Sequence, residues 1–284
     1  MEVQFLRTKS TFEDDQNLIY MHDTISSRQN PLCQLARSLR QAKYRRKYQQ
    51  FLIEGENAVT NALTARWELV AVISTLEAAP KIQDLLTLHQ QDPTILHQIQ
   101  EDVLQSVCET QTSPKVAAIA TLKSTFDEGL WRSAKVLLVL DGVSDPGNLG
   151  TLLRAADASG VDGVLLTGHC VDPFSPKVVR SSAGSIFHCP VEILDTQTFL
   201  FKSQQYQFEL VAASAHNGTN CDVFLWPQKV CLILGNEKQG ISEELLQASK
   251  HQITIPIRGR AESLNVAMAG TVLMFKAVDT NAKI

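Results

Sequence analysis

The feature that most constrains this chain is a set of three polar turns, each just beyond an apolar run with the character of a β-strand. The apolar runs span 136–140, 230–234 and 253–257. The turns that follow lie at 145–148, 235–237 and 262–265. In an open α/β sheet, the carboxyl ends of parallel strands meet helix starts at one edge, and ligands bind there. The sequence therefore predicts a parallel-sheet α/β domain with one site built from all three turns.

Five polar side chains in or near these turns are candidates for the chemistry of such a site. They are Asn148, Arg154, Glu237, Ser263 and Asn265. Each has a structural alternative. For Asn148 the favoured alternative is capping of the following helix, for Arg154 it is a surface salt bridge, and for Glu237 it is a solvated loop charge. Ser263 or Asn265 must cap the last helix. The spacing matches neither a P-loop nor a Gly-x-Gly-x-x-Gly turn, which argues against a phosphate-hydrolysing enzyme or a nucleotide dehydrogenase.

Positive charge is concentrated in one segment of an otherwise acidic chain. The formal net charge is -4, yet no Asp or Glu occurs between Thr24 and Ile53, where seven Lys or Arg fall. Apolar residues recur there at intervals of three and four, which predicts a basic amphipathic helix from about Asn30 that leads into a strand at 51–53. Its candidate phosphate-binding residues are Arg37, Arg40, Lys43, Arg45, Arg46 and Lys47. The alternative is a solvated helix face.

The cysteines and the apolar runs bear on the cellular compartment. The six cysteines show no short paired spacing and no metal-ligand pattern with His, so we expect reduced, mostly buried thiols and no metal site. No apolar run approaches the length needed to span a bilayer, and the first residues lack the layout of a signal peptide. A cytoplasmic location without membrane attachment is the expectation.

The chain of 284 residues is long enough for two domains of ordinary size. Residues 1–25 are a polar extension to which the pattern assigns no structure. Alternating helices and strands over 26–122 predict a compact α/β unit. Periodicity is lost between 121 and 134, which suggests a linker, and the parallel-sheet domain follows over 135–284.

The three turns taken together resemble the signature motifs of the SpoU (TrmH-like) family of SPOUT RNA methyltransferases. The matching segments read Asp-Pro-Gly-Asn-Leu-Gly-Thr-Leu-Leu-Arg at 145–154, Gly-Asn-Glu at 235–237 and Glu-Ser-Leu-Asn at 262–265. This resemblance covers roughly 135–279. The first half is similar, more weakly, to the ribosomal-protein-like substrate-binding domain that precedes many members, through the basic helix and Phe-Leu-Ile-Glu-Gly at 51–55. Asn57 stands where an Arg is common, and the turn at 113–117 lacks the usual Gly, so the details of RNA contact are left open.

The resemblance implies a trefoil-knotted α/β domain that forms a homodimer, binds S-adenosylmethionine and methylates a ribose 2′-hydroxyl of RNA. Ribosomal RNA is favoured over transfer RNA. By motif position, the residues that hold the cofactor are Leu234, Gly235, Ile255 and Leu264. Asn148, Arg154, Glu237, Ser263 and Asn265 take catalytic and supporting roles. Because a guanidinium stays protonated, Arg154 is expected to activate the hydroxyl electrostatically, and Glu237 to pair with Arg154 or hold the motif loops.

Three other readings stay open at the level of sequence. A SPOUT protein could methylate a base, although Arg154 in this motif speaks against it. A catalytically silent RNA-binding or ribosome-assembly protein could share the fold, although all five motif side chains are present. A nicotinamide-dependent dehydrogenase is a distant third.

Overall fold

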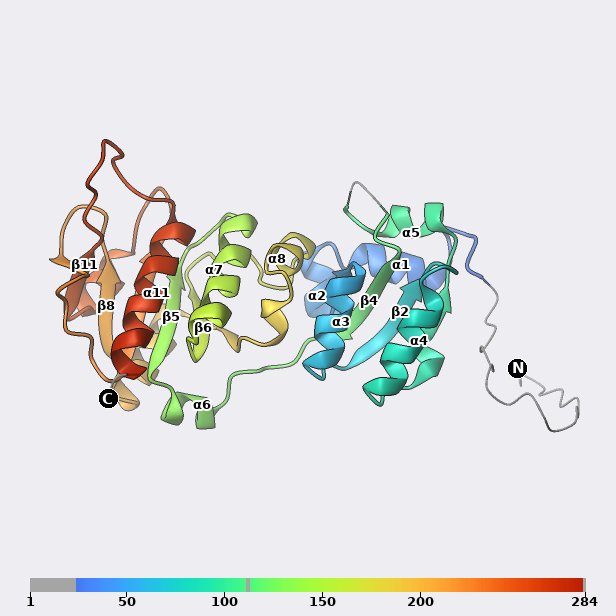
Figure 1. Ribbon diagram of the computed structural model, residues 1–284, viewed down its shortest axis with the longest axis horizontal. Coiled ribbons are helices and arrows are strands. Elements are labelled where there is room, and N and C mark those ends of the chain that lie inside the picture. Colours follow the sequence, from blue (N-terminus) through green and yellow to red (C-terminus); the bar gives the residue numbers. More distant parts are fainter. Residues whose placement is uncertain (1–23, 111–112, 283–284) are drawn as a thin grey trace, which may run out of the picture.

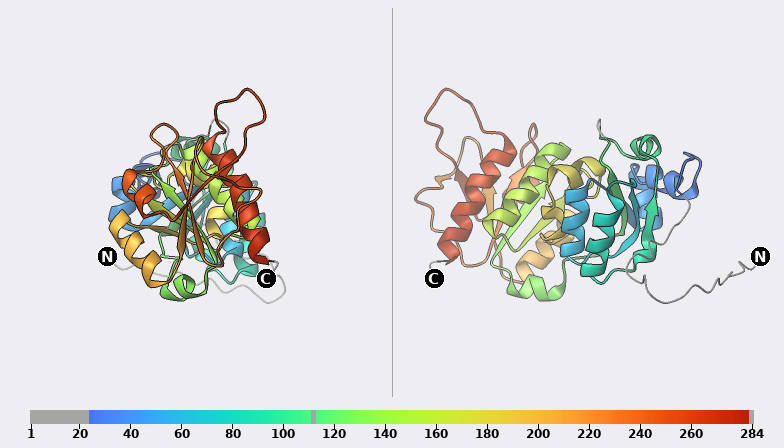
Figure 2. Two further views of the ribbon diagram at one scale, coloured as in Figure 1. Left: turned by 90° about the vertical axis from the view of Figure 1, so that its left-hand side faces the viewer. Right: turned by 45° about the vertical axis from the view of Figure 1, so that its right-hand side comes forward.

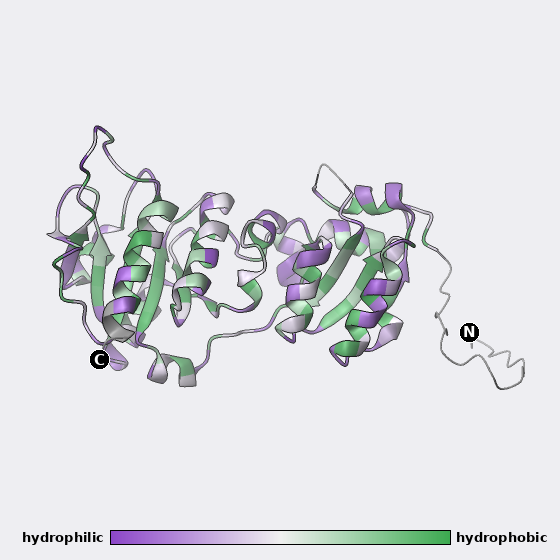
Figure 3. Cartoon of the chain, in the orientation of Figure 1, coloured by the Kyte–Doolittle hydropathy of each residue, from purple (hydrophilic) through white to green (hydrophobic). Residues whose placement is uncertain are grey.

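The computed structural model describes residues 24–110 and 113–282, which form two α/β domains side by side (Figure 1). Expectations for residues 1–23 lie outside the described residues. The first domain contains a four-stranded sheet of order β1-β4-β2-β3, and the second a seven-stranded sheet of order β7-β6-β5-β10-β8-β11-β9. In both domains hydrophobic residues concentrate on the strands, and hydrophilic ones on outward-facing helix surfaces (Figure 3). Within the described ranges, no helix is long and apolar enough to cross a membrane.

The first domain alternates helices and strands. Its strands are β1 (Gln50–Glu54), β2 (Leu69–Ser74), β3 (Leu96–Gln98) and β4 (Val116–Thr121). Its helices are α1 (Pro31–Ser38), α2 (Ala42–Tyr48), α3 (Glu56–Thr64), α4 (Ala79–Leu88) and α5 (Glu101–Val107), with a 3-10 turn at Pro93–Ile95. β4 pairs antiparallel with β1 and β2, whereas β3 adds parallel to β2.

The basic segment forms two helices, and the single helix predicted from its periodicity is wrong. α1 buries Cys33 and Ala36 and ends at Ser38, and α2 starts at Ala42. The carbonyl groups at the end of a helix lack partners within it. Here the Arg45 guanidinium donates to the carbonyls of Leu39 and Arg40, at 2.7 and 2.8 Å, and so stabilises the break.

The second domain is the predicted parallel sheet. Its strands are β5 (Val136–Asp141), β6 (Gly163–Thr167), β7 (Val191–Ile193), β8 (Glu209–Ala213), β9 (Thr219–Asn220), β10 (Val230–Gly235) and β11 (His251–Thr254). Its helices are α6 (Glu128–Ser133), α7 (Pro146–Ser159), α8 (Pro176–Ser181), α9 (Thr196–Gln205), α10 (Glu243–Ala248) and α11 (Val266–Ala282), with a 3-10 turn at Ser185–Phe187. Every strand pair runs parallel. The carboxyl ends of β5, β10 and β11 therefore lie along one edge.

Helices cover both faces of this sheet. α7 and α11 pack side by side on one face, and α9 lies on the other (Figure 2). The second face is closed by a separate apolar cluster that includes Trp131, Phe199 and Leu245. Trp131 belongs to α6, so part of the segment predicted as a linker is a helix anchored under the sheet. The expected strand at 253–257 is shifted, because β11 begins at His251 and ends before Pro256, which cannot donate to a ladder.

A mixed aromatic core joins the two domains. Phe51 and Trp67 of the first domain meet Phe174 and Phe187 of the second, with ring centroids 4.9 Å apart for Phe51 and Phe174 and 5.7 Å for Trp67 and Phe187. The fully buried Trp67 indole also donates a 3.0 Å hydrogen bond to the Phe187 carbonyl. This packing fixes the first domain against the second.

Candidate active site

The first motif turn joins β5 to α7. Asp145 is the N-cap of α7, and its Oδ1 accepts a 2.8 Å hydrogen bond from the backbone N–H of Asn148. Pro146 follows at the first helical position, where its fixed φ suits a helix start. The capping role that the sequence favoured for Asn148 is therefore wrong. Asn148 lies inside the first turn, and its side chain is available for other contacts.

The Asn148 side chain connects the three motif turns. Its Nδ2 donates to Glu237 Oε1 at 2.7 Å, and its Oδ1 accepts from Asn265 Nδ2 at 3.0 Å. Asn265 also caps α11, because its Oδ1 accepts from the backbone N–H of Ala267 at 2.9 Å. The predicted convergence of the three turns is confirmed. Among the described residues Glu237 has no ion pair with Arg154; it holds the motif turns together.

The second motif turn is closed by its own backbone and tied to β5. Asn236 and Gly240 exchange two N–H to carbonyl hydrogen bonds, both 2.9 Å long. A Cβ on Gly235 would lie 2.2 Å from the Gly240 carbonyl carbon, so only glycine fits there. The buried Asp141 carboxylate accepts from the Ser242 N–H at 2.7 Å and anchors the far end of the turn.

A cavity of about 630 Å³ lies against these turns. All four residues predicted to hold a cofactor, Leu234, Gly235, Ile255 and Leu264, line it. Glu237, Ser263 and Asn265 line it too, whereas Asn148 and Arg154 do not. A further wall comes from 213–216, at the end of β8, which the sequence reasoning missed. The sequence feature that could have predicted this wall is the apolar run of β8, because the carboxyl end of β8 lies at this edge of the sheet.

Comparison with known proteins identifies the family of this chain. The model of the SpoU rRNA Methylase family matches residues 135–275, and that of the MRM3-like substrate binding domain matches 30–118. The 23S rRNA (guanosine(2553)-2'-O)-methyltransferase RlmP of Bacillus subtilis is 34% identical over 251 residues, which cover 88% of this chain and 97% of RlmP. The chain belongs to the SpoU rRNA methylase family.

Two further proteins are similar to most of this chain. An uncharacterized tRNA/rRNA methyltransferase of Synechocystis is 35% identical, over 89% of this chain and 93% of its own length. The crystal structure of an AdoMet-bound rRNA methyltransferase from Sinorhizobium meliloti superposes with a TM-score of 0.79 at 28% identity, covering 89% of this chain and 96% of that one. The likeness therefore includes both domains.

Arg154 of the first SpoU motif lies apart from the other motif side chains. Its side chain is exposed on α7, whereas Leu149, Leu152 and Leu153 of the same helix are fully buried. In the part of the chain that the structure describes, Arg154 forms no ion pair. The structure thus gathers Asn148, Glu237 and Asn265 and leaves the guanidinium on the outer surface of the domain.

The predicted RNA-binding residues divide into two groups. Arg37 and Arg40 donate to backbone carbonyls within the first domain. Arg45 is 3% exposed and binds Asp172 of the second domain at 2.6 Å, so its predicted contact with RNA phosphates is wrong. The other three, which are exposed on α2, are Lys43, Arg46 and Lys47.

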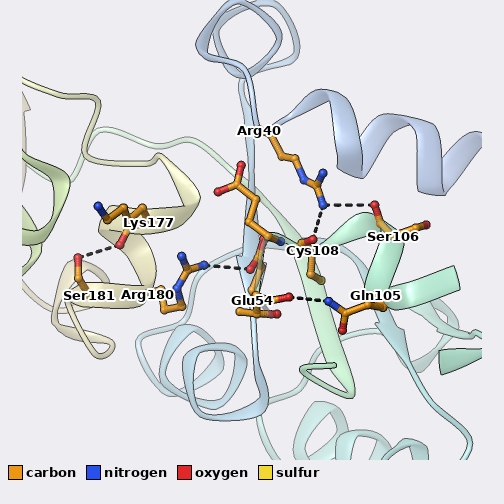
Figure 4. A network of polar contacts seen from close by, with 10 residues as sticks. Arg40, Glu54, Gln105, Ser106, Cys108, Lys177, Arg180 and Ser181 are labelled. Carbon is orange, nitrogen blue, oxygen red and sulfur yellow. Dashed lines mark hydrogen bonds and ion pairs between the residues drawn. The ribbon is translucent and has the colours of Figure 1, made fainter. Parts of the chain in front are cut away.

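A second ion pair crosses the domain junction near α8 (Figure 4). Arg180 Nη1 lies 3.1 Å from Glu54 Oε2, and the other oxygen of Glu54 accepts from the Glu109 N–H at 2.9 Å. Burial raises the pKa of Glu54 above its ordinary value, although the Glu109 hydrogen bond and Arg180 oppose this. Arg180 is therefore an interdomain contact.

All six cysteines are free thiols, as predicted, and five of them are buried. Burial raises the pKa of Cys108 to about 12 and that of Cys170 to about 11. Thiols with such values stay protonated at neutral pH and are poor nucleophiles.

Proposed function

We propose that this protein transfers a methyl group from S-adenosylmethionine to a ribose 2′-hydroxyl of structured RNA, with ribosomal RNA favoured over transfer RNA. The observation that carries the proposal is the hydrogen-bonded set Asn148, Glu237 and Asn265, of which Glu237 and Asn265 also line the cavity. Support comes from RlmP, named a 23S rRNA 2'-O-methyltransferase, and from the AdoMet-bound structure of the Sinorhizobium relative.

The cavity suits S-adenosylmethionine in size and in chemistry. Its volume of about 630 Å³ falls in the ordinary range for small-molecule sites. Apolar side chains of Leu234, Ile255 and Leu264 would hold the purine ring, and the backbone of the Gly235 turn would offer hydrogen-bonding groups at close approach. When bound, this cofactor supplies an electrophilic methyl group whose leaving thioether is neutral. The protein therefore needs no acid for the leaving group.

The chemical difficulty lies in the nucleophile, because a ribose 2′-hydroxyl is hardly ionised at neutral pH. Its oxygen must be oriented, and the negative charge that develops on it must be stabilised. Arg154 carries the permanent positive charge of the motifs, and a guanidinium cannot serve as a base in this pH range. Arg154 therefore stabilises the developing alkoxide and positions the ribose. Asn148 and Asn265 hold the turns at the cavity.

The surface beside Arg154 fits a second copy of this chain. α11 packs next to α7 and exposes an apolar stripe of Met268, Val272 and Phe275. These positions recur at four and three residues, so they share one side of the helix. We infer that this stripe forms a homodimer interface and that dimerisation encloses Arg154. We also propose that the protein is cytoplasmic, and the support is its similarity to RlmP of Bacillus subtilis, named a 23S rRNA methyltransferase.

The test is a methyl-transfer assay with labelled S-adenosylmethionine and separate pools of unmodified ribosomal and transfer RNA, followed by digestion to nucleosides. A 2′-O-methyl nucleoside in the ribosomal pool supports the proposal, and label in the transfer RNA pool selects the other substrate. Label on a base would replace the proposal with base methylation. Cofactor binding without transfer to either pool would favour the catalytically silent RNA-binding protein.

A further inference from the structure

Helix α2 carries the only cluster of unpaired positive charge from the basic segment, as far as the described residues go. Arg28 lies near Asp102, and Arg45 binds Asp172. Arg37 and Arg40 donate to backbone carbonyls. The other three cations of 24–53 all lie on α2, are exposed and have no ion-pair partner within the described ranges. They are Lys43, Arg46 and Lys47. With no acid nearby in sequence, this surface suits a polyanion.

Two tyrosines lie among these cations. Tyr44 and Tyr48 are four residues apart on α2, and their rings are nearly parallel, with centroids 6.2 Å apart and planes at 10°. The Lys43 ammonium lies 4.7 Å from the Tyr44 ring centroid, and that of Lys47 lies 5.1 Å from the Tyr48 centroid. Tyr48 is 41% exposed. A planar aromatic surface flanked by cations is the usual equipment for binding unpaired nucleotides.

Arg45 of the same helix is fixed to the second domain. Nε and Nη2 of Arg45 lie 3.0 and 2.6 Å from Asp172 Oδ2, while Nη1 binds the carbonyls of Leu39 and Arg40. A buried guanidinium held by such bonds defines the position of its helix. The exposed tyrosine and lysines are therefore held in a set place relative to the domain that contains the cofactor cavity.

We propose that α2 is a stacking ledge for an unpaired base of the RNA substrate, with Tyr48 contacting the base and Lys43, Arg46 and Lys47 binding the flanking phosphates. The proposal rests on the function proposed above and specifies its substrate: RNA that presents an unpaired base to the first domain. A paired A-form helix hides its base faces, so an aromatic side chain is of use only where a base is unstacked. The ion pair between Arg45 and Asp172 fixes the position of that base relative to the catalytic domain.

Binding of two RNA probes to the full chain tests the ledge. The probes are a short single-stranded oligoadenylate and a perfectly paired RNA duplex of equal length, both followed by fluorescence anisotropy. Base stacking on an aromatic side chain is worth about 1–3 kcal/mol, so Tyr48→Ala should weaken single-strand binding by about five- to a hundredfold. Duplex binding should stay within about twofold, since it uses phosphates alone. Tyr48→Phe, which keeps the ring, should match the wild type on both probes.

Two control variants separate charge from stacking. Lys47→Ala should weaken binding of both probes and lower the slope of log affinity against log salt by about one. Phe201→Ala, at an exposed aromatic residue on α9, should leave both affinities unchanged. The thermal unfolding midpoint of Tyr48→Ala should equal that of the wild type, because the ring is half-exposed.

The proposal is overturned if Tyr48→Ala binds oligoadenylate like the wild type, or if it loses single-strand and duplex binding equally. It is also overturned if the wild type binds an acidic peptide as tightly as RNA and Tyr48→Ala abolishes both, since the surface would then serve a protein partner. Methyl transfer by the wild type is scored separately. If the wild type transfers methyl groups and Tyr48→Ala binds RNA like the wild type, the proposed ledge is wrong and the proposed methyltransferase function stands. If the wild type transfers no methyl groups, the proposed function is wrong.

Discussion

Asn265 has two hydrogen-bonding duties that substitution can separate. Its Oδ1 caps α11, and its Nδ2 donates to Asn148. Serine is as good a cap as asparagine, so Asn265→Ser should keep the unfolding free energy and lower methyl transfer by about two- to tenfold through loss of one hydrogen bond. Asn265→Ala should lose the same activity and about 1 kcal/mol of stability as well. Urea unfolding and initial rates on both variants give the comparison, and equal stabilities would contradict the capping role.

Arg154 should dominate the chemical step. Arg154→Ala is expected to lower the rate of methyl transfer by about a hundred- to ten-thousand-fold, because charge on the 2′-oxygen is no longer stabilised. Cofactor affinity, measured by calorimetry, should stay unchanged, since Arg154 does not line the cavity. Arg132→Ala, which removes an exposed guanidinium on α6, is the matched control. A variant that keeps more than half of the wild-type turnover would end the assignment.

Residue roles were predictable where a motif defined them and not where a distant partner did. The motifs placed Glu237, Asn265 and the cavity residues together. They could not show that Asp145 caps α7, because Asp145 and Asn148 are both good caps three residues apart. Arg45 was misassigned to RNA because its partner, Asp172, lies 127 residues further along the chain. A local charge pattern cannot predict a contact between residues so far apart in the sequence.

Helices α7 and α8 cross at a point that admits no extra atom. A Cβ on Gly150 would lie 1.9 Å from Ser181 Oγ and 2.8 Å from the Ser181 carbonyl carbon. Gly150→Ala should therefore destabilise the protein by about 1–3 kcal/mol, despite the better helix propensity of alanine. Gly259→Ala is a fitting comparison, because a Cβ there meets open space. Thermal unfolding of the two variants should show a lower midpoint for Gly150→Ala alone.

Element types were easier to predict than element ends. The strands of the catalytic sheet followed from their apolar runs, since a parallel sheet buried on both faces needs continuous apolar segments. The break between α1 and α2 did not follow, because the apolar spacing continues through it. What ends α1 is tertiary: its apolar face packs under the first sheet, and Arg45 supplies the donors for its last carbonyls.

At the scale of the whole molecule, Glu54 should make the domain junction sensitive to pH. Its pKa is raised in the folded state, chiefly by burial. Between the ordinary Glu pKa of about 4.3 and that raised value, the folded state binds more protons than the unfolded one, so stability falls as pH rises through this window. Arg180, Arg40, Glu109 and Cys108 surround the carboxylate and remain in place in a Glu54→Gln variant.

Glu54→Gln keeps an acceptor for the Glu109 N–H and removes the titration. Urea midpoints of wild type and variant, compared from about pH 4 to pH 7, should diverge in one direction: the wild type loses stability relative to Glu54→Gln as pH rises. A parallel pair of curves would show that Glu54 does not titrate in this window. The exposed Glu77→Gln serves as control, because its carboxylate is mostly solvated.

The two-domain organisation was predictable because both halves have regular periodicity and the segment between them lacks it, and because the motifs fix the sheet edge. The docking of the domains was not, since it depends on Phe51, Trp67, Phe174 and Phe187 meeting from four separate segments. The knot implied by the family is a property of the path of the whole chain. Strand order alone does not define that path, so the knot stays a prediction.

Assembly should depend on the apolar stripe of α11. Met268 is 64% exposed and belongs to this stripe, so Met268→Glu would place a charge in the proposed interface at little cost to the isolated fold. Sedimentation should give the mass of two chains for the wild type and of one for the variant, while Phe201→Glu on α9, equally exposed, should leave the dimer intact. A single copy of the chain already forms the cavity, so cofactor affinity should survive in the monomer. Methyl transfer should fall, because Arg154 would then lie open to solvent; a monomer as active as the wild type would contradict the role of the dimer.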